Sequence, residues 1–271
     1  MQSLSIDRAW TETRQRVFAN AALLWPIAFT LLALPGVIFQ YLVLQPRLEA
    51  FAASGNTDFT VFEGSWYLWG LPVIALLIVG TVAVLLLTGR SGVSVGEALA
   101  VGLRRSVPLF IAMLLLGVVA GAAAGVIGGI LTATMGAVGA AIGRLLLLIL
   151  FAYGGVRIGF LSPAVAAYEG VGPIAILRRS WALSRGNFWR LFGILLVLVV
   201  VSFIVSVFVT IVFGIVVSLA SGGQPGPVGT LLTLLVSGLL NAVISVFFTV
   251  MAGQIYRQLA GDPREAEKLS A

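Results

Sequence analysis

Six long apolar stretches set the strongest limit on how this chain can fold. Each reaches the length of about 20 residues that a helix needs to cross about 30 Å of hydrocarbon. Their expected bounds are Ala21–Leu44, Trp66–Thr88, Pro108–Leu131, Arg144–Ala166, Leu191–Ala220 and Thr230–Ile255. The period-two alternation of membrane β-strands is absent from them. The sequence therefore predicts an all-α integral membrane protein with six transmembrane helices.

The amino-acid composition supports this class. Only 10% of the residues are charged and 60% are hydrophobic, whereas soluble domains contain about 25% charged residues. Ten acidic and 16 basic residues cannot give a globule of 271 residues a polar surface. The connection Thr132–Gly143 is hardly polar, so the boundary between the third and fourth spans stays open.

The chain contains no cysteine and no histidine. Disulfides, thiolate nucleophiles, histidine-containing zinc sites and Ser-His-Asp catalysis are therefore excluded. The remaining reactive groups are ten scattered carboxylates and a set of arginines. We expect no catalytic residues, no metal and no cofactor, and therefore a protein that is not an enzyme.

Basic residues predict the orientation of the chain. With a cytoplasmic N-terminus, 13 of the 16 basic residues fall on the cytoplasmic side: Arg8, Arg14, Arg16, Arg90, Arg104, Arg105, Arg178, Arg179, Arg185, Arg190, Arg257, Arg264 and Lys268. Cytoplasmic loops carry an excess of such residues, so both termini are expected in the cytoplasm, with the chain in a bacterial cytoplasmic membrane. The first apolar run exceeds the core of a signal peptide, about 7–15 residues, and is expected to remain as a helix.

A short amphipathic segment rich in arginine precedes the first, third and fifth spans, at residues 5–18, 94–106 and 173–185. In each case a hinge and an apolar run follow. This order predicts direct repeats of an in-plane helix plus a transmembrane hairpin, with the three in-plane helices forming a basic cytoplasmic collar. The alternative is that these segments are the ordinary basic loops of a multi-spanning protein.

The repeats form one membrane domain, and its predicted divisions are about 4–90, 91–167 and 168–257, followed by a tail at 258–271. Pro108 is expected to start the third span and Pro173 the third in-plane helix, because proline suits the first helical turn. Gly186 offers a left-handed helix end, and Asn187 an N-cap for the fifth span.

The stretch Leu161–Leu196 carries a small-residue and proline segment, then Glu-Gly, then the pattern RRSW-x-L-x-RGNFWR-x-FG. It resembles the membrane domain attached to glycerophosphoryl diester phosphodiesterases and its stand-alone bacterial relatives, most of which have no assigned function. In that family, the phosphodiesterase activity belongs to a separate soluble barrel with histidines and acidic metal ligands. The 271 residues contain no such barrel, so the resemblance implies the membrane module and not the enzymatic activity.

The densest cationic and aromatic cluster consists of Arg178, Arg179, Arg185, Arg190, Trp181 and Trp189. Guanidinium groups match phosphate with two parallel hydrogen bonds, and indoles favour the membrane interface. The cluster therefore predicts contact with phospholipid headgroups. The alternative is that it only orients and anchors a basic amphipathic helix.

Arg157 lies inside the fourth expected span, past its midpoint on the cytoplasmic side. Intramembrane arginines usually face a bundle interior and have a partner. The sequence offers three kinds of partner for Arg157: a bound lipid or substrate anion, Glu169, or carbonyls freed at Ser162-Pro163. Glu169 itself is expected to bridge to the arginines of the third in-plane helix or to cap that helix.

Gly117, Gly121, Gly125 and Gly129 recur at four-residue spacing in the third span. Glycines on one helix face let a neighbouring backbone approach closely. The spacing predicts tight helix packing, more readily against a helix of the same chain than against another protein.

These features favour a non-enzymatic scaffold or lipid-interacting module that acts through its cytoplasmic collar. Its expected partners are membrane phospholipids, with a membrane-protein partner or a second copy as a further possibility, and no nucleic acid. The alternative is a transporter or flippase for an anionic amphiphile, with Arg157 as the counter-charge; an intramembrane enzyme comes third.

Overall fold

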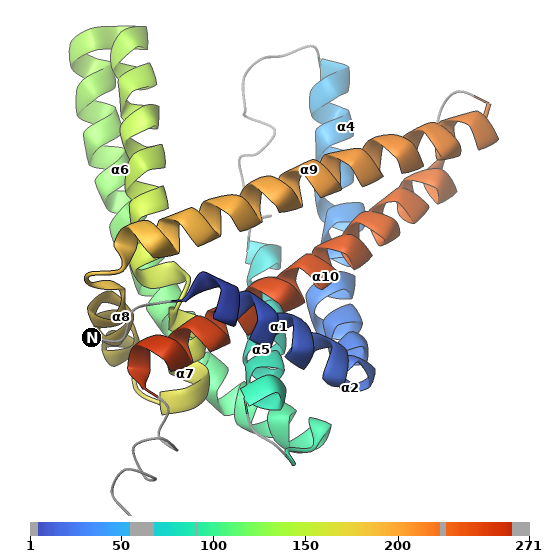
Figure 1. The fold of residues 1–271 in the computed structure, drawn as a ribbon. Coiled ribbons are helices and arrows are strands. Elements are labelled where there is room, and N and C mark those ends of the chain that lie inside the picture. Colours follow the sequence, from blue (N-terminus) through green and yellow to red (C-terminus); the bar gives the residue numbers. More distant parts are fainter. Residues whose placement is uncertain (1–4, 55–67, 90–91, 223–225, 262–271) are drawn as a thin grey trace, which may run out of the picture.

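The computed structural model describes residues 5–54, 68–89, 92–222 and 226–261. Within these ranges every regular element is a helix, and five helical segments are long and apolar enough to cross a membrane (Figure 1). These segments are Ala21–Ala53, Gly70–Gly89, Val95–Glu169, Phe188–Ala220 and Pro227–Ala260. The predicted all-α, membrane-compatible class is confirmed. Trp66, the expected start of the second span, lies outside the described residues.

The first apolar segment is a continuous rod of short helices whose character changes near its prolines. It consists of α2 (Ala21–Ile27), the π-helix η1 (Ala28–Ala33), α3 (Leu34–Phe39), the π-helix η2 (Gln40–Leu44) and α4 (Gln45–Ser54). Pro26 lies inside α2, and Pro35 lies in the first turn of α3. Because proline lacks an N–H and crowds the preceding turn, the ladder of hydrogen bonds cannot continue unchanged. Wider π-helical turns accommodate this break.

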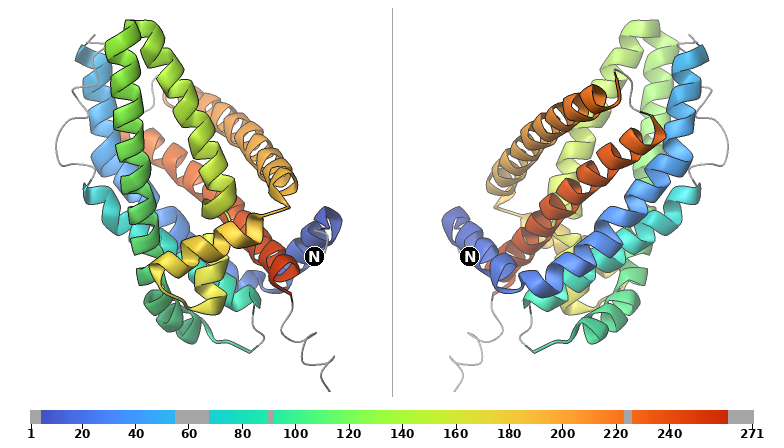
Figure 2. Two further views of the ribbon diagram at one scale, coloured as in Figure 1. Left: turned by 90° about the vertical axis from the view of Figure 1, so that its left-hand side faces the viewer. Right: turned by 90° about the vertical axis from the view of Figure 1, so that its right-hand side faces the viewer.

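Helix α5 (Gly70–Gly89) is followed by α6 (Val95–Gly154), which folds back on itself as a hairpin (Figure 2). The reversal is at Gly136, whose φ of 58° and ψ of −134° suit only glycine. The reversal lies within the predicted connection Thr132–Gly143 and locates the boundary that the sequence leaves open. A Cβ atom at Gly139 would meet the carbonyl of Leu131, so the tight return also needs glycine there.

The three predicted repeats differ at their hinges. The first in-plane segment is a separate helix, α1 (Ile6–Ala19), capped by Ser5. The second is not separate, because α6 begins at Val95 and continues through Pro108. The expectation that Pro108 starts a new helix is therefore wrong: Ser94 provides the cap for the whole helix, and the chain keeps its helical path across the proline.

The third in-plane segment ends in a sharp elbow. The π-helix η5 (Gly155–Gly159) and α7 (Ser162–Glu169) continue from α6, and α8 (Pro173–Ser184) follows. Gly186 then adopts a φ of 81°, and α9 (Phe188–Ala220) starts after Asn187. The predicted left-handed position of Gly186 is confirmed. A second left-handed glycine, Gly170, ends α7 with a φ of 64°.

Buried residues gather where α1, α5 and α7 meet the end of α10 (Pro227–Ala260), which we call the compact end. The α6 hairpin extends away from the compact end, and α9 starts near the base of the hairpin and runs diagonally away from it (Figure 1). Most large apolar side chains of the hairpin and of α9 are exposed. An apolar surface of this extent matches a lipid environment, where no polar covering is needed.

The glycine stripe of the third span does not pack against another helix of the described chain. Apart from the neighbouring residues and backbone of the same helix, no heavy atom of the described chain lies within 4 Å of a Cβ placed at Gly117, Gly121, Gly125 or Gly129. The prediction of packing within the same chain is therefore wrong for these four residues. The close glycine contact in the hairpin joins Gly143 to Gly128, where a Cβ on Gly143 would lie 3.4 Å from the Gly128 Cα.

Candidate functional site

A polar network around Gln254 joins three helices at the compact end. Gln254 is fully buried on α10. With the Gln254 amide oriented so that its oxygen faces the donors, its nitrogen donates to Glu12 Oε2 at 2.9 Å and its oxygen accepts from Arg16 Nε and Arg257 Nη2, both at 3.1 Å. The same two arginines donate to the Thr88 carbonyl at the end of α5, over 2.6 and 3.4 Å. Two cations therefore cap the negative end of the α5 dipole.

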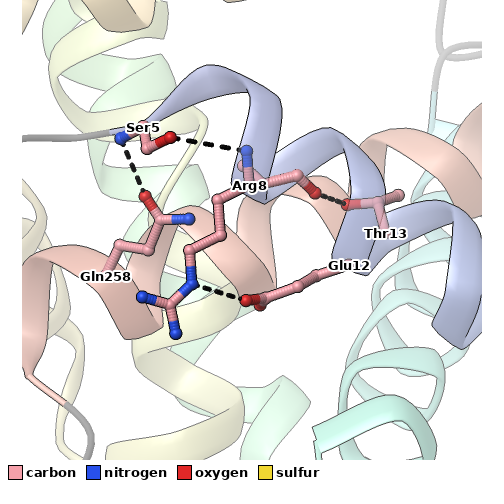
Figure 3. A network of polar contacts seen from close by, with 6 residues as sticks. Ser5, Arg8, Glu12, Thr13 and Gln258 are labelled. Atoms are coloured by element: carbon pink, nitrogen blue, oxygen red, sulfur yellow. Dashed lines mark hydrogen bonds and ion pairs between the residues drawn. The ribbon is translucent and has the colours of Figure 1, made fainter.

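One hydrogen bond ties the start of α1 to the end of α10, beside two polar contacts within the α1 segment (Figure 3). The Ser5 hydroxyl caps the helix by accepting from the Arg8 N–H at 3.4 Å, and the Ser5 N–H donates to Gln258 Oε1 at 3.1 Å. Arg8 Nε pairs with Glu12 Oε1 at 2.8 Å. This arrangement places the amphipathic helix α1 against α10 along its Ala9, Thr13 and Val17 face, which is fully buried.

Glu169 bridges α7 to α8 and α10. Its Oε1 accepts from Arg179 Nε at 2.9 Å and from the Tyr256 hydroxyl at 2.7 Å. The hydrogen bond to Glu169 raises the pKa of Arg179 above its ordinary value, so this guanidinium stays fully protonated. The predicted bridge from Glu169 to an arginine of the third in-plane helix is confirmed. Arg178 and Arg179 are both exposed, but of the two only Arg179 has a carboxylate partner among the described residues.

Arg157 lies among three aromatic rings. Its guanidinium carbon is 5.4 Å from the ring centre of Tyr153, 5.2 Å from that of Trp181 and 5.2 Å from that of Phe188. Its Nε donates to the Tyr153 hydroxyl at 3.2 Å. The partner Glu169, which the sequence offers for Arg157, is taken by Arg179, so that pairing is wrong. The aromatic partners were not predicted, although Trp181 was singled out for the interface.

The remaining members of the predicted lipid-contact cluster are exposed around the elbow between α8 and α9. We define the elbow surface as Arg178, Arg185, Trp189 and Arg190; all four side chains are exposed, Trp189 by 78%. Among the described residues, neither of the two ion pairs involves these arginines. The elbow surface thus presents three guanidinium groups and an indole, the combination that suits phosphate groups at a membrane interface.

Polar groups for chemistry or metal binding do not gather elsewhere in the described ranges. No group of three carboxylate, histidine or cysteine side chains that could hold a metal ion occurs there. The Gln254 network and the roles of Tyr168 and Tyr256 were not predicted from the sequence. The sequence feature that could have indicated the network is the rarity of polar residues in the spans, because Gln254 is one of the few.

Fold and site together define an all-helical protein with several membrane-compatible helices and an arginine-rich elbow at its compact end. The chain belongs to a family described as a domain of unknown function, DUF7847, whose model matches residues 16–259. Comparisons with curated proteins and with solved structures found no match. Nothing in them links the chain to the membrane domain of glycerophosphoryl diester phosphodiesterases, and that resemblance stays a prediction.

Proposed function

We propose that this protein crosses a bacterial cytoplasmic membrane six times, with both termini in the cytoplasm. Five apolar segments support this topology, because the third of them reverses at Gly136 and so supplies two crossings. An even number of crossings places both termini on the same side. The compact end then faces the cytoplasm, and α1 and α8 form two of the three parts of the collar that the repeat pattern predicts.

The protein acts, in this proposal, as a non-enzymatic scaffold that binds anionic phospholipid headgroups at the elbow surface. The observation that carries the proposal is the division of the arginines at the compact end. Arg16, Arg105, Arg179 and Arg257 bind carbonyls, an amide or a carboxylate of the chain itself. The three arginines of the elbow surface are exposed beside an exposed indole, and neither ion pair of the described residues involves them.

Neutralising the elbow surface is expected to remove the preference for anionic lipid. The test variant carries Arg178→Gln, Arg185→Gln and Arg190→Gln. Each basic residue near an anionic surface contributes about 1 kcal/mol, so the ratio of bound phosphatidylglycerol to phosphatidylcholine should fall by at least about fivefold. Native mass spectrometry of the purified protein, equilibrated with equal amounts of the two lipids, measures this ratio.

A matched control removes the same charge from other exposed arginines: Arg14→Gln, Arg104→Gln and Arg144→Gln. It should retain most of the preference, because these residues belong to α1 and α6 and not to the elbow surface. An equal loss in both variants would mean that net charge alone attracts the lipid. Unchanged selectivity in the elbow variant would refute the proposed binding surface.

The proposed orientation predicts which single cysteines can be labelled from outside intact cells. Ser221→Cys, at the end of α9, should react with a membrane-impermeant maleimide. Thr11→Cys on α1 and Ala182→Cys on α8, both at exposed positions, should react only after the membrane is opened. The chain has no native cysteine, so labelling is specific. Labelling of Thr11→Cys from outside, with Ser221→Cys protected, would reverse the orientation.

A further inference from the structure

The rings around Arg157 come from three different elements that meet at the elbow. Tyr153 lies in the last turn of α6, Trp181 in α8, and Phe188 is the first residue of α9. Tyr153 also contacts both of the other rings, with centroids 6.0 Å from Trp181 and 5.2 Å from Phe188. The Arg157 guanidinium therefore lies where α8 and α9, the two helices of the elbow, meet the last turn of α6.

The main-chain carbonyl of Arg157 also binds the elbow, through the last residue of α8. Arg157 lies in the π-helix η5, and its carbonyl accepts a hydrogen bond from the Ser184 hydroxyl at 3.2 Å. Ser184 is the last residue of α8 and is fully buried. One helical turn earlier in α8, the Ser180 hydroxyl lies 3.1 Å from the Ser162 hydroxyl. A π-helical turn often marks a functional position, and here it presents both the side chain and the carbonyl of Arg157 to the elbow.

The charge of Arg157 has no carboxylate partner in the described chain, where the ion pairs are Arg8–Glu12 and Arg179–Glu169. Its Nη1 atom is buried and has no oxygen or nitrogen acceptor. In this arrangement the Nη1 atom is therefore closed to a lipid phosphate. The aromatic faces are the groups that stabilise this cation, and such attraction strengthens as water is excluded.

We infer that Arg157 is a positioning residue that clamps the α8–α9 elbow and thereby aims the elbow surface at the membrane interface. The effect of the clamp on lipid binding rests on the proposed function. The contacts that form the clamp do not depend on it. The clamp also gives Arg157 a role different from that of a counter-charge for a transported anion. The elbow arginines bind the headgroups, while Arg157 holds the helix ends from which they project.

The test uses a disulfide as a reporter of α8, one of the two helices of the elbow, docked against the start of α7. Ser162→Cys and Ser180→Cys place two thiols where the hydroxyls lie 3.1 Å apart, and the chain has no other cysteine. Arg157→Met in this background should slow disulfide formation by about tenfold, because the loss of the cation frees the aromatic rings. Arg157→Lys should restore most of the rate, and Arg14→Met, at an exposed site on α1, should leave it unchanged. The rate is followed by mass spectrometry after controlled oxidation.

A second readout is the ratio of phosphatidylglycerol to phosphatidylcholine bound to the Arg157→Met and Arg157→Lys variants with the native serines. A clamp predicts that Arg157→Met lowers the ratio, that Arg157→Lys restores it, and that Arg157→Met causes no further loss when the three elbow arginines are already neutral. A lower ratio with an unchanged disulfide rate would make Arg157 a lipid or substrate ligand and overturn the inference. An unchanged disulfide rate overturns it in every case. If the native protein shows no lipid preference, the proposed function fails, and a slowed disulfide still supports the clamp.

Discussion

Replacing Gln254 with leucine is expected to lower the free energy of unfolding by at least about 3 kcal/mol. The side chain is fully buried and contacts three charged groups: Glu12, Arg16 and Arg257. Leucine has a similar volume but can neither accept from the guanidinium groups nor donate to the carboxylate. A hydrogen bond to a charged group contributes about 1.5–3 kcal/mol, and a buried charged group left without its partner costs more than a neutral one.

The measurement is unfolding by sodium dodecyl sulfate in mixed micelles, followed by circular dichroism. Gln40→Leu makes the same chemical change at an exposed position in the first apolar segment and should not destabilise the protein. Gln254→Glu keeps the two acceptor contacts and should lose less than Gln254→Leu. A Gln254→Leu protein as stable as the native one would show that the network does not hold α1 against α10.

The apolar spans could be predicted from the sequence because hydropathy is a local property. A run of about 20 apolar residues is sufficient evidence for a membrane-compatible helix, whatever its neighbours are. The reversal at Gly136 was placed correctly within a window because a hairpin needs a glycine-rich connection. The hinge at Pro108 was not, because proline in an apolar environment can stay inside a helix when the surrounding structure tolerates the lost bond.

The division of the arginines could not be predicted, because it depends on which helices pack together. Arg178 and Arg179 are neighbours in the sequence, yet a helix turns by about 100° between them. Only Arg179 meets Glu169, and that carboxylate is placed by α7 and by Tyr256 on α10. A pattern of basic residues therefore indicates the side of the membrane, but does not indicate which of them bind inside the protein.

The spacing of glycines likewise indicates a helix face, but does not indicate whether another helix packs against it. Glycines at a spacing of four residues mark one face of a helix. At Gly117 this face is open, because a Cβ placed there would have no atom of the described chain within 4 Å other than those of the local helix backbone. The glycines that do lie against side chains are not in a regular series. A Cβ on Gly238 would meet Val37, and one on Gly253 would lie 2.9 Å from the Tyr168 hydroxyl. Close packing therefore requires a partner helix as well as a small residue.

Tyr168 provides the clearest case of such packing. Its hydroxyl donates to the Leu85 carbonyl at 3.1 Å, and its ring lies 5.3 Å from that of Tyr256 and 5.7 Å from the guanidinium carbon of Arg257. Gly89 lies against the same ring: a Cβ there would be 2.8 Å from the Tyr168 oxygen. The hydrogen bond and the ring contacts hold the Tyr168 side chain in this position.

Gly89→Ala is therefore expected to destabilise the protein by about 1–3 kcal/mol, the usual effect of an extra carbon in a packed core. Unfolding in mixed micelles measures the loss. Gly117→Ala adds the same methyl group to an open helix face and should be neutral or stabilising by up to about 1 kcal/mol, because alanine favours a helix over glycine. In a Tyr168→Ala background the overlap disappears, so Gly89→Ala should then cost no stability. An equal loss in both backgrounds would mean that the methyl group meets something other than Tyr168, and that this ring does not set the distance between α5 and α7.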